Sequence, residues 1–208
     1  MYAAALALIA SAHAEQDPGA LLSPGAGEAQ WRPLVEALAA KGTVMAAFTE
    51  RRFFPFRRAP MLLRGVLRIS PERGLSLQYT DPDESILIAD SVGLLLKDRE
   101  GHLRDLPSGP RGTGAMAALL PIMRFDLQAL YPRFLIRACR SGAEWRFDFT
   151  PRDQETARSL GAISVRGSDS DVRRLEFRRS SSQRVEIEVG ETRTGVAFSP
   201  AELKQFFR

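Results

Sequence analysis

The chain has 208 residues, of which 44% are hydrophobic, 26% charged and 8% aromatic. This composition excludes disorder as the main state, because disordered chains are poor in apolar and aromatic residues. A single cysteine excludes an internal disulfide framework, and no run of about 18 apolar residues is present that could cross a bilayer as a helix. The length is that of about one domain.

The net charge of +4 comes almost wholly from arginine, because lysine occurs only at Lys41, Lys97 and Lys204. Such an excess fits binding to nucleic acid or anionic lipid. It also fits solvated strand faces, and the arginines are indeed spread along the chain and interleaved with acids. We therefore expect no nucleic-acid partner. The one concentrated basic and aromatic cluster is RRFFPFRR, residues 51–58.

Residues 1–14 read MYAAALALIASAHA, an apolar stretch that ends in the A-x-A site Ala12-His13-Ala14. This pattern is typical of a secretory signal peptide cleaved after Ala14, although no Lys or Arg precedes the apolar stretch. A buried N-terminal helix is the alternative. The expected first mature residue is Glu15, whereas bacterial lipoproteins need a cysteine there. We therefore expect an exported, periplasmic protein that carries no lipid of its own.

The mature chain is expected to hold a short leader and one domain. Residues 15–28 are rich in Gly, Pro and Ala and predict a flexible leader, and residues 29–208 form the single domain. A helix is expected over about residues 29–40, because Trp31, Leu34, Val35 and Leu38 fall on one face.

After Gly42 the hydrophobic period changes to two, which predicts strands. The chain breaks at residues 51–60, where Pro55 and Pro60 indicate an edge or a loop. The clearest alternation is Trp145-Arg-Phe147-Asp-Phe149. About ten short strands are expected, over residues 44–50, 62–69, 75–79, 86–89, 94–97, 134–138, 145–149, 163–166, 175–178 and 184–189, with a last one over 196–198.

Two helical segments interrupt or follow these strands. Residues 112–131 are strongly apolar with helical spacing and are expected to form a helical segment that Pro121 breaks. Ser199-Pro200-Ala201-Glu202 is a capping box that predicts a short helix over residues 201–207. The elements together predict a mainly β protein with helices (α+β), whose curved antiparallel sheet has one wet face.

Few residues could carry catalysis. His102 is the only histidine after the signal peptide and lies in a polar turn, and Cys139 lies in an apolar strand. No nucleophile elbow, zinc-ligand spacing or phosphate-binding loop is present. Asp81, Asp83 and Glu84 fit a solvated turn. We expect no enzyme, no metal and no cofactor, and a hydrolase that uses His102 is the weakest alternative.

The apolar face of the sheet and the helical segment can be explained in two ways. They form either an ordinary core closed by a helix, or a cavity with a lid that holds an acyl chain. Composition alone favours the core.

Several motifs resemble one family. Residues 65–90 read GVLRISPERGLSLQYTDPDESILIAD, with a glycine that opens a strand and a P-D-E-S-I-L tract over Pro82–Leu87. Together with Phe48-Thr49-Glu50, the helical segment around residues 116–123, and Phe147–Pro151, this stretch resembles the LolA family, periplasmic carriers of outer-membrane lipoproteins. The resemblance covers nearly all of the mature chain.

The resemblance implies an incomplete β-barrel, covered by an N-terminal helix and an inserted helical lid, around a hydrophobic cavity for lipoprotein acyl chains. It implies a monomer without catalytic residues or cofactor, which meets an inner-membrane donor complex and an outer-membrane acceptor and touches the membrane only transiently. The implied cavity residues are Val44, Phe48, Leu67, Ile69, Leu75, Leu77, Tyr79, Ile86 and Ile88. The implied lid residues are Met116, Leu119, Leu120, Ile122 and Met123.

The sequence departs from the family pattern at three places. Leu75 and Leu77 stand where the family has aromatic residues that line the cavity, and Ser91 follows Asp90 in place of glycine. Pro71 stands where the family has an arginine that ties the barrel to the lid, so Arg68 or Arg73 is expected to serve as the latch. The implied function is a periplasmic carrier of lipoproteins or related lipid-like cargo. The alternative is an envelope lipid-binding or sensing module that does not shuttle its ligand.

Overall fold

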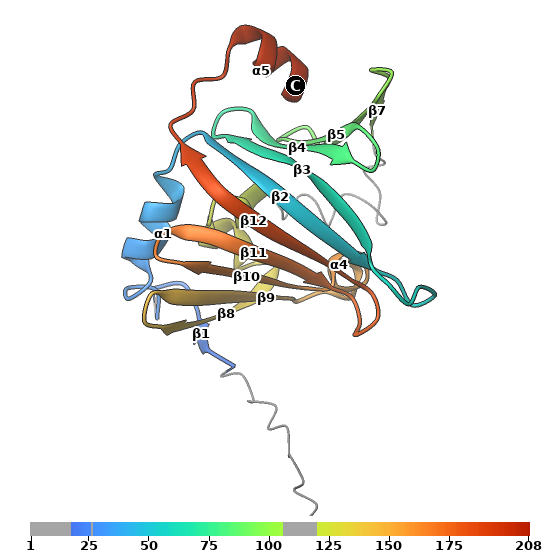
Figure 1. The fold of residues 1–208 in the computed structure, drawn as a ribbon. Helices are drawn as coiled ribbons and strands as arrows, with labels where there is room; N and C mark the ends of the chain where they lie inside the picture. The colour runs from blue at the N-terminus through green and yellow to red at the C-terminus, as the bar shows by residue number, and fades with distance from the viewer. Residues whose placement is uncertain (1–17, 26, 106–119) are drawn as a thin grey trace, which may run out of the picture.

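The computed structural model describes residues 18–25, 27–105 and 120–208, and these build one curved sheet of twelve strands (Figure 1). Its strands are β1 (Ala20–Leu22), β2 (Val44–Phe53), β3 (Met61–Ser70), β4 (Gly74–Asp81), β5 (Ser85–Ala89), β6 (Leu94–Asp98), β7 (Leu103–Asp105), β8 (Phe134–Ser141), β9 (Glu144–Pro151), β10 (Ala162–Ser168), β11 (Asp171–Arg178) and β12 (Arg184–Thr194).

All neighbouring strands pair antiparallel in the order β1-β8-β9-β10-β11-β12-β2-β3-β4-β5-β6-β7. The sheet is not closed, because β1 and β7 stand at its two edges and do not pair with each other. The predicted fold class, a curved antiparallel sheet that forms an incomplete barrel with helices, is confirmed.

Four helices with defined bounds accompany the sheet: α1 (Arg32–Ala39), α3 (Leu127–Leu130), α4 (Gln154–Leu160) and α5 (Pro200–Phe206). Residues 120–123 are helical as well. Helix α5 has the predicted capping box, in which the Ser199 hydroxyl and the Glu202 carboxylate each bond the other residue's backbone N–H. Within the part of the chain that the structure describes, no helix has the length and apolar character to span a bilayer.

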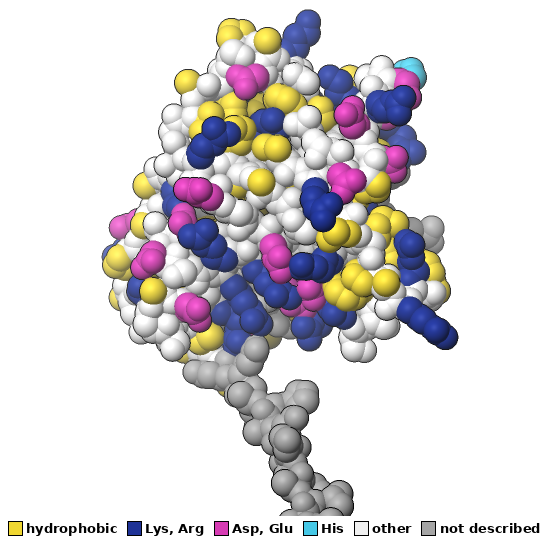
Figure 2. Space-filling view, in the orientation of Figure 1, with side chains coloured by type: hydrophobic (Ala, Val, Ile, Leu, Met, Phe, Trp, Pro, Cys, Tyr) yellow, Lys and Arg dark blue, Asp and Glu magenta, His cyan; other side chains and the backbone are white. Residues whose placement is uncertain are grey.

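The arginine excess lies largely on the outer, convex face of the sheet. There Arg51 pairs with Glu188 at 2.6 Å, Arg174 with Glu186 at 3.0 Å, and Arg178 with Glu176. Basic and acidic side chains alternate over this face in Figure 2. The charge pattern is therefore that of a strand face that bears arginines paired with carboxylates. The exposed pair of Arg51 and Glu188 contributes little to stability, whereas Glu176 and Glu186 are buried beneath their arginines.

The core lies on the concave face. Strand β9 directs Trp145, Phe147 and Phe149 inward, and all three are buried. Phe147 meets the Trp31 ring, just before α1, at a centroid distance of 5.0 Å, and the Phe125 ring at 5.8 Å. Helix α1 thus covers one end of the concave face through the apolar stripe that the sequence predicted.

Gly65 allows β3 and β4 to approach closely at a bulge. A Cβ at this position would lie 2.0 Å from the Gln78 carbonyl oxygen and 2.9 Å from the Phe48 ring. Such distances are far below van der Waals contact, so only glycine fits without a shift of the strand.

Several predicted elements differ from the structure. Residues 20–22 lie in the predicted flexible leader, yet they form β1, which pairs with β8 and buries Leu22. Strand β2 continues through Phe53, into the predicted break. Residues 196–198 form no strand, because Phe198 leaves the sheet to pack near α5. Helix α4 was not predicted, since its sequence QETARSL is mostly polar.

We expect the Phe147→Ala variant to lose about 3–5 kcal/mol of unfolding free energy, because Phe147 is fully buried among aromatic rings. Chemical denaturation followed by tryptophan fluorescence measures this loss. The matched control is Leu135→Ala on the outer face, which should cost about 0.5 kcal/mol or less. Equal losses in both variants would contradict the assignment of the two faces.

Candidate functional site

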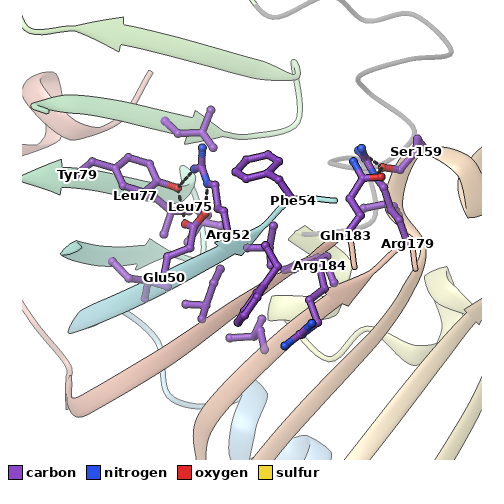
Figure 3. A pocket seen from close by; sticks show the side chains of 18 of the residues that line it. Glu50, Arg52, Phe54, Leu75, Leu77, Tyr79, Ser159, Arg179, Gln183 and Arg184 are labelled. Carbon is purple, nitrogen blue, oxygen red and sulfur yellow. Dashed lines mark hydrogen bonds and ion pairs between the residues drawn. The ribbon is translucent and has the colours of Figure 1, made fainter. Parts of the chain in front are cut away.

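A cavity of about 360 Å³ opens on the concave face, between β2–β5 and β11–β12 (Figure 3). Most of its lining is apolar. The lining residues are Glu50, Arg52, Phe53, Phe54, Leu67, Leu75, Leu77, Tyr79, Leu87, Met123, Ser159, Leu160, Leu175, Phe177, Arg179, Gln183, Arg184, Val185 and Ile187.

One wall is a row of leucines set side by side by the strand register. Leu67 of β3 pairs with Leu77 of β4, which pairs with Leu87 of β5. Residues directly opposite in an antiparallel pair point to the same face, so all three side chains enter the cavity. Leu75 lies on the same face, two positions before Leu77.

The facing wall comes from β11 and β12, through Leu175, Phe177, Val185 and Ile187. Leu160, at the end of α4, adds to it. Side chains from segments far apart in the sequence therefore enclose one apolar space.

A buried polar group interrupts this apolar lining. The Tyr79 hydroxyl donates to Glu50 Oε2 at 2.8 Å, and Arg52 donates to Glu50 Oε1 and to the Tyr79 oxygen. Glu50 is only 2% exposed. Burial, with the neighbouring Glu50 charge, raises the pKa of the Tyr79 phenol far above its usual value, so the phenol keeps its proton. Burial is the largest single effect on Arg52 and opposes its charge, but the bond to Glu50, the Glu50 charge and Tyr79 together outweigh it and leave the Arg52 pKa raised.

The rim beside this group is also polar. Arg179, in the β11–β12 loop, donates from Nε to the Ser159 carbonyl oxygen at 2.8 Å, which ties the loop to α4. Gln183 lines the same rim (Figure 3). The Arg184 guanidinium lies over the Phe53 ring and bonds Glu186 on the outer face. The cavity is thus polar at its rim and around Glu50, and apolar toward Leu67 and Met123.

A second cavity of about 510 Å³ continues beyond Leu67 and Met123, which line both spaces. Val44 and Ile69 line it, as do residues at the end of α1 and around Pro71. Met123 therefore stands between the two cavities. Methionine is flexible and repacks easily around irregular shapes, so this partition can move.

The helical segment 120–123 covers this junction. Ile122 is fully buried in the core and Met123 is half-buried, while Leu120 is only partly covered. Arg124, directly after the segment, donates to the Pro71 carbonyl oxygen. The lid prediction also named Met116 and Leu119, which lie outside the described residues.

Neither predicted latch arginine reaches this segment. Arg68 points to the outer face, where its guanidinium lies 3.6 Å from the centre of the Phe206 ring, and burial lowers its pKa. Arg73 donates to the Arg208 carbonyl oxygen at 3.3 Å. Both therefore contact the C-terminal segment. In the predicted latch the sheet supplies the arginine and the lid accepts its bond. In the structure the arginine, Arg124, follows the helical segment and the acceptor is the Pro71 carbonyl oxygen beside the sheet.

The structure places most of the predicted cavity residues on the concave face. Leu67, Leu75, Leu77 and Tyr79 line the first cavity and Val44 and Ile69 the second. Phe48 is buried against Tyr79 with a ring distance of 5.4 Å.

The prediction was wrong for Ile86 and Ile88, which pack on the outer face with Leu95, Phe206 and Phe207. Their tract, Ser-Ile-Leu-Ile-Ala, is apolar throughout, so the sequence alone did not indicate that Leu87 faces inward.

Sequence reasoning also missed the Glu50–Arg52–Tyr79 group. Its signal was present in β2, where Val44, Ala46 and Phe48 alternate inward and Glu50 and Arg52 continue the same parity. Charged residues at strand positions that face the core are unusual, because a buried charge is costly unless it is paired.

The histidine lies away from the cavity. His102 Nδ1 lies 3.1 Å from Asp98 Oδ2 on an exposed turn, near Glu100. The bonds that Asp98 accepts from His102 lower the Asp98 pKa. Cys139 is a free, half-buried thiol in β8.

No protein-family model matches the chain, and the search of curated proteins found no match. Solved structures similar to it include a LolA superfamily protein from Nitrosomonas europaea, with 9% identity over 83% of this chain and 96% of that chain and a TM-score of 0.45. An outer membrane lipoprotein-sorting protein domain from Vibrio parahaemolyticus has 8% identity over 84% and 94%, with a TM-score of 0.46.

A chain of the Pseudomonas aeruginosa MucA/MucB complex has 14% identity over 84% of this chain and 59% of that chain, with a TM-score of 0.45. At such low identities and TM-scores below 0.5, the likeness does not assign a function to this chain.

We expect the Glu50→Gln variant to lose about 2–3 kcal/mol of unfolding free energy, because it leaves Arg52 without its counter-charge in a buried wall. This is less than the cost for a fully buried pair, since Arg52 is partly exposed. The control is Glu188→Gln. Its partner Arg51 is on β2, like Glu50, but points to the outer face, so we expect a cost of at most about 1 kcal/mol. Denaturant titration compares the two, and equal costs would contradict the buried position of Glu50.

Proposed function

We propose that this chain is an exported, periplasmic carrier that binds the acyl chains of lipoproteins or related lipid-like cargo and transfers them toward the outer membrane. The single observation that carries the proposal is the apolar cavity with its row of inward leucines. Each methylene that enters such a space from water contributes about 0.8 kcal/mol. A chain of many methylenes would therefore be held without any specific polar contact.

The gradient of polarity supports an amphiphilic cargo. Arg52, Arg179 and Gln183 stand at one end, while the space beyond Leu67 and Met123 is largely apolar. An acyl chain would point toward Met123, with its polar end at the rim. Movement of Met123 would join the two cavities and admit a longer chain.

Release needs a difference in affinity between two states or two proteins, not a weak cavity. The helical segment 120–123 is the element that would move, with the Arg124 bond to the Pro71 carbonyl as its latch. The predicted donor at the inner membrane and acceptor at the outer membrane remain part of this proposal, as does the signal peptide over residues 1–14. This hydrogen bond, at an exposed side chain, is a weak constraint, so the larger cost of opening would be the withdrawal of the buried Ile122 side chain.

The test is to fill the cavity. Leu87→Trp puts a large ring among Leu67, Leu77 and Tyr79, and we expect it to weaken binding of a fluorescent acyl probe at least tenfold with little change in melting temperature. The control is Leu135→Trp, the same substitution on the exposed outer face. Unchanged probe binding in a folded Leu87→Trp protein would contradict the proposal.

A further inference from the structure

We propose that the β2–β3 loop, residues 54–60, docks the rim of the cavity onto a bilayer surface rich in anionic phospholipid. The loop joins β2 to β3 and projects beyond the edge of the sheet (Figure 1). It holds most of the basic and aromatic cluster in the sequence, which the proposed carrier function leaves unexplained.

The loop exposes an aromatic side chain that the fold does not need there. Phe56 is 82% exposed, the highest value among the large hydrophobic side chains that the structure describes as exposed. It stacks on Phe54 at a centroid distance of 5.4 Å, and Phe54 lines the cavity. An apolar surface therefore runs from the tip of the loop into the cavity. Phenylalanine beside basic residues is typical of surfaces that enter the headgroup region of a membrane.

The charges of the loop are available to a partner. On the flanking strands Arg51, Arg52 and Arg64 each pair with a carboxylate, from Glu188, Glu50 and Asp81. Within the described residues, Arg57 and Arg58 are exposed and form no ion pair.

Arg179, in the adjoining β11–β12 loop, bonds only a backbone carbonyl. Three arginines without a carboxylate partner among the described residues thus lie together at the rim, where anionic headgroups would attract them. Figure 2 shows hydrophobic and basic side chains together on this projecting part of the molecule.

A membrane fits these features better than a nucleic acid does. A stacking platform for successive bases needs several free aromatic faces side by side, whereas here Phe54 covers one face of Phe56 and itself lines the cavity. A bilayer also matches the continuity between loop and cavity, because its apolar interior would lie next to the cavity rim. The inference goes beyond the carrier proposal, and its test requires no cargo.

The experiment is co-sedimentation of the mature protein with vesicles of phosphatidylcholine, or of equal parts phosphatidylcholine and phosphatidylglycerol. We expect binding to the anionic vesicles only, and weaker binding as salt is raised, because the charges are exposed. Both Phe56→Ser and the double variant Arg57→Ser/Arg58→Ser should lower the bound fraction roughly tenfold.

Two matched controls should bind like the wild type. Val92→Ser removes another exposed apolar side chain, 73% exposed, in the turn between β5 and β6. Arg137→Ser/Arg140→Ser removes two exposed arginines from β8, far from the loop in the strand order. Equal losses in the controls and in the loop variants would overturn the proposal, since net charge or apolarity alone would then explain binding.

A second measurement places the loop in the membrane directly. In Phe56→Trp the new indole should shift its emission to the blue on anionic vesicles and be quenched by brominated phosphatidylglycerol. The native Trp31 and Trp145 are 5% and 3% exposed, so the lipid quencher should not reach them. Absence of vesicle binding by the wild type, or binding to single-stranded RNA alone, would overturn the proposal. The fluorescent acyl probe, assayed without vesicles, reports separately on the cavity.

Discussion

The structure depends on one constraint, the strict alternation of side chains across strands held in register. Arg51, Glu188 and Glu186 form an ion-paired outer face, while the residues between them face a largely apolar interior. Because β1 and β7 do not pair, the sheet curves without closing. A curved sheet with one apolar face must cover that face with helices or leave a space. Here α1 covers one end, and the space remains at the other.

The buried Glu50–Arg52–Tyr79 group makes one end of this cavity polar. An isolated carboxylate in an apolar wall would be costly, and here the Tyr79 hydroxyl and the Arg52 guanidinium offset that cost. The group lies on the half of β2 that leads to the β2–β3 loop. The polar part of the cavity and the exposed Phe56 are therefore at the same end of the sheet, and the apolar space around Met123 is at the other.

Much of the fold was predictable because its strands alternate clearly. Trp145, Phe147 and Phe149 were assigned to one face correctly, and the capping box at Ser199 gave the terminal helix. The prediction failed where a tract is apolar throughout, because the sequence then does not indicate which side chains face inward. Ile86 and Ile88 were therefore placed in the cavity, although it is Leu87 that faces it.

Contacts between distant segments were not predictable at all. The bond from Arg124 to Pro71, and the place of Leu22 beside β8, depend on how the sheet curves, which no local pattern records.

The most direct test of the account is native mass spectrometry of the protein purified without detergent or organic solvent. We expect a population heavier than the polypeptide by the mass of an acyl species, which solvent extraction removes and added acyl ligand restores. A spectrum that holds the polypeptide mass alone, unchanged after incubation with acyl ligand, would contradict the claim that the cavity holds lipid-like cargo.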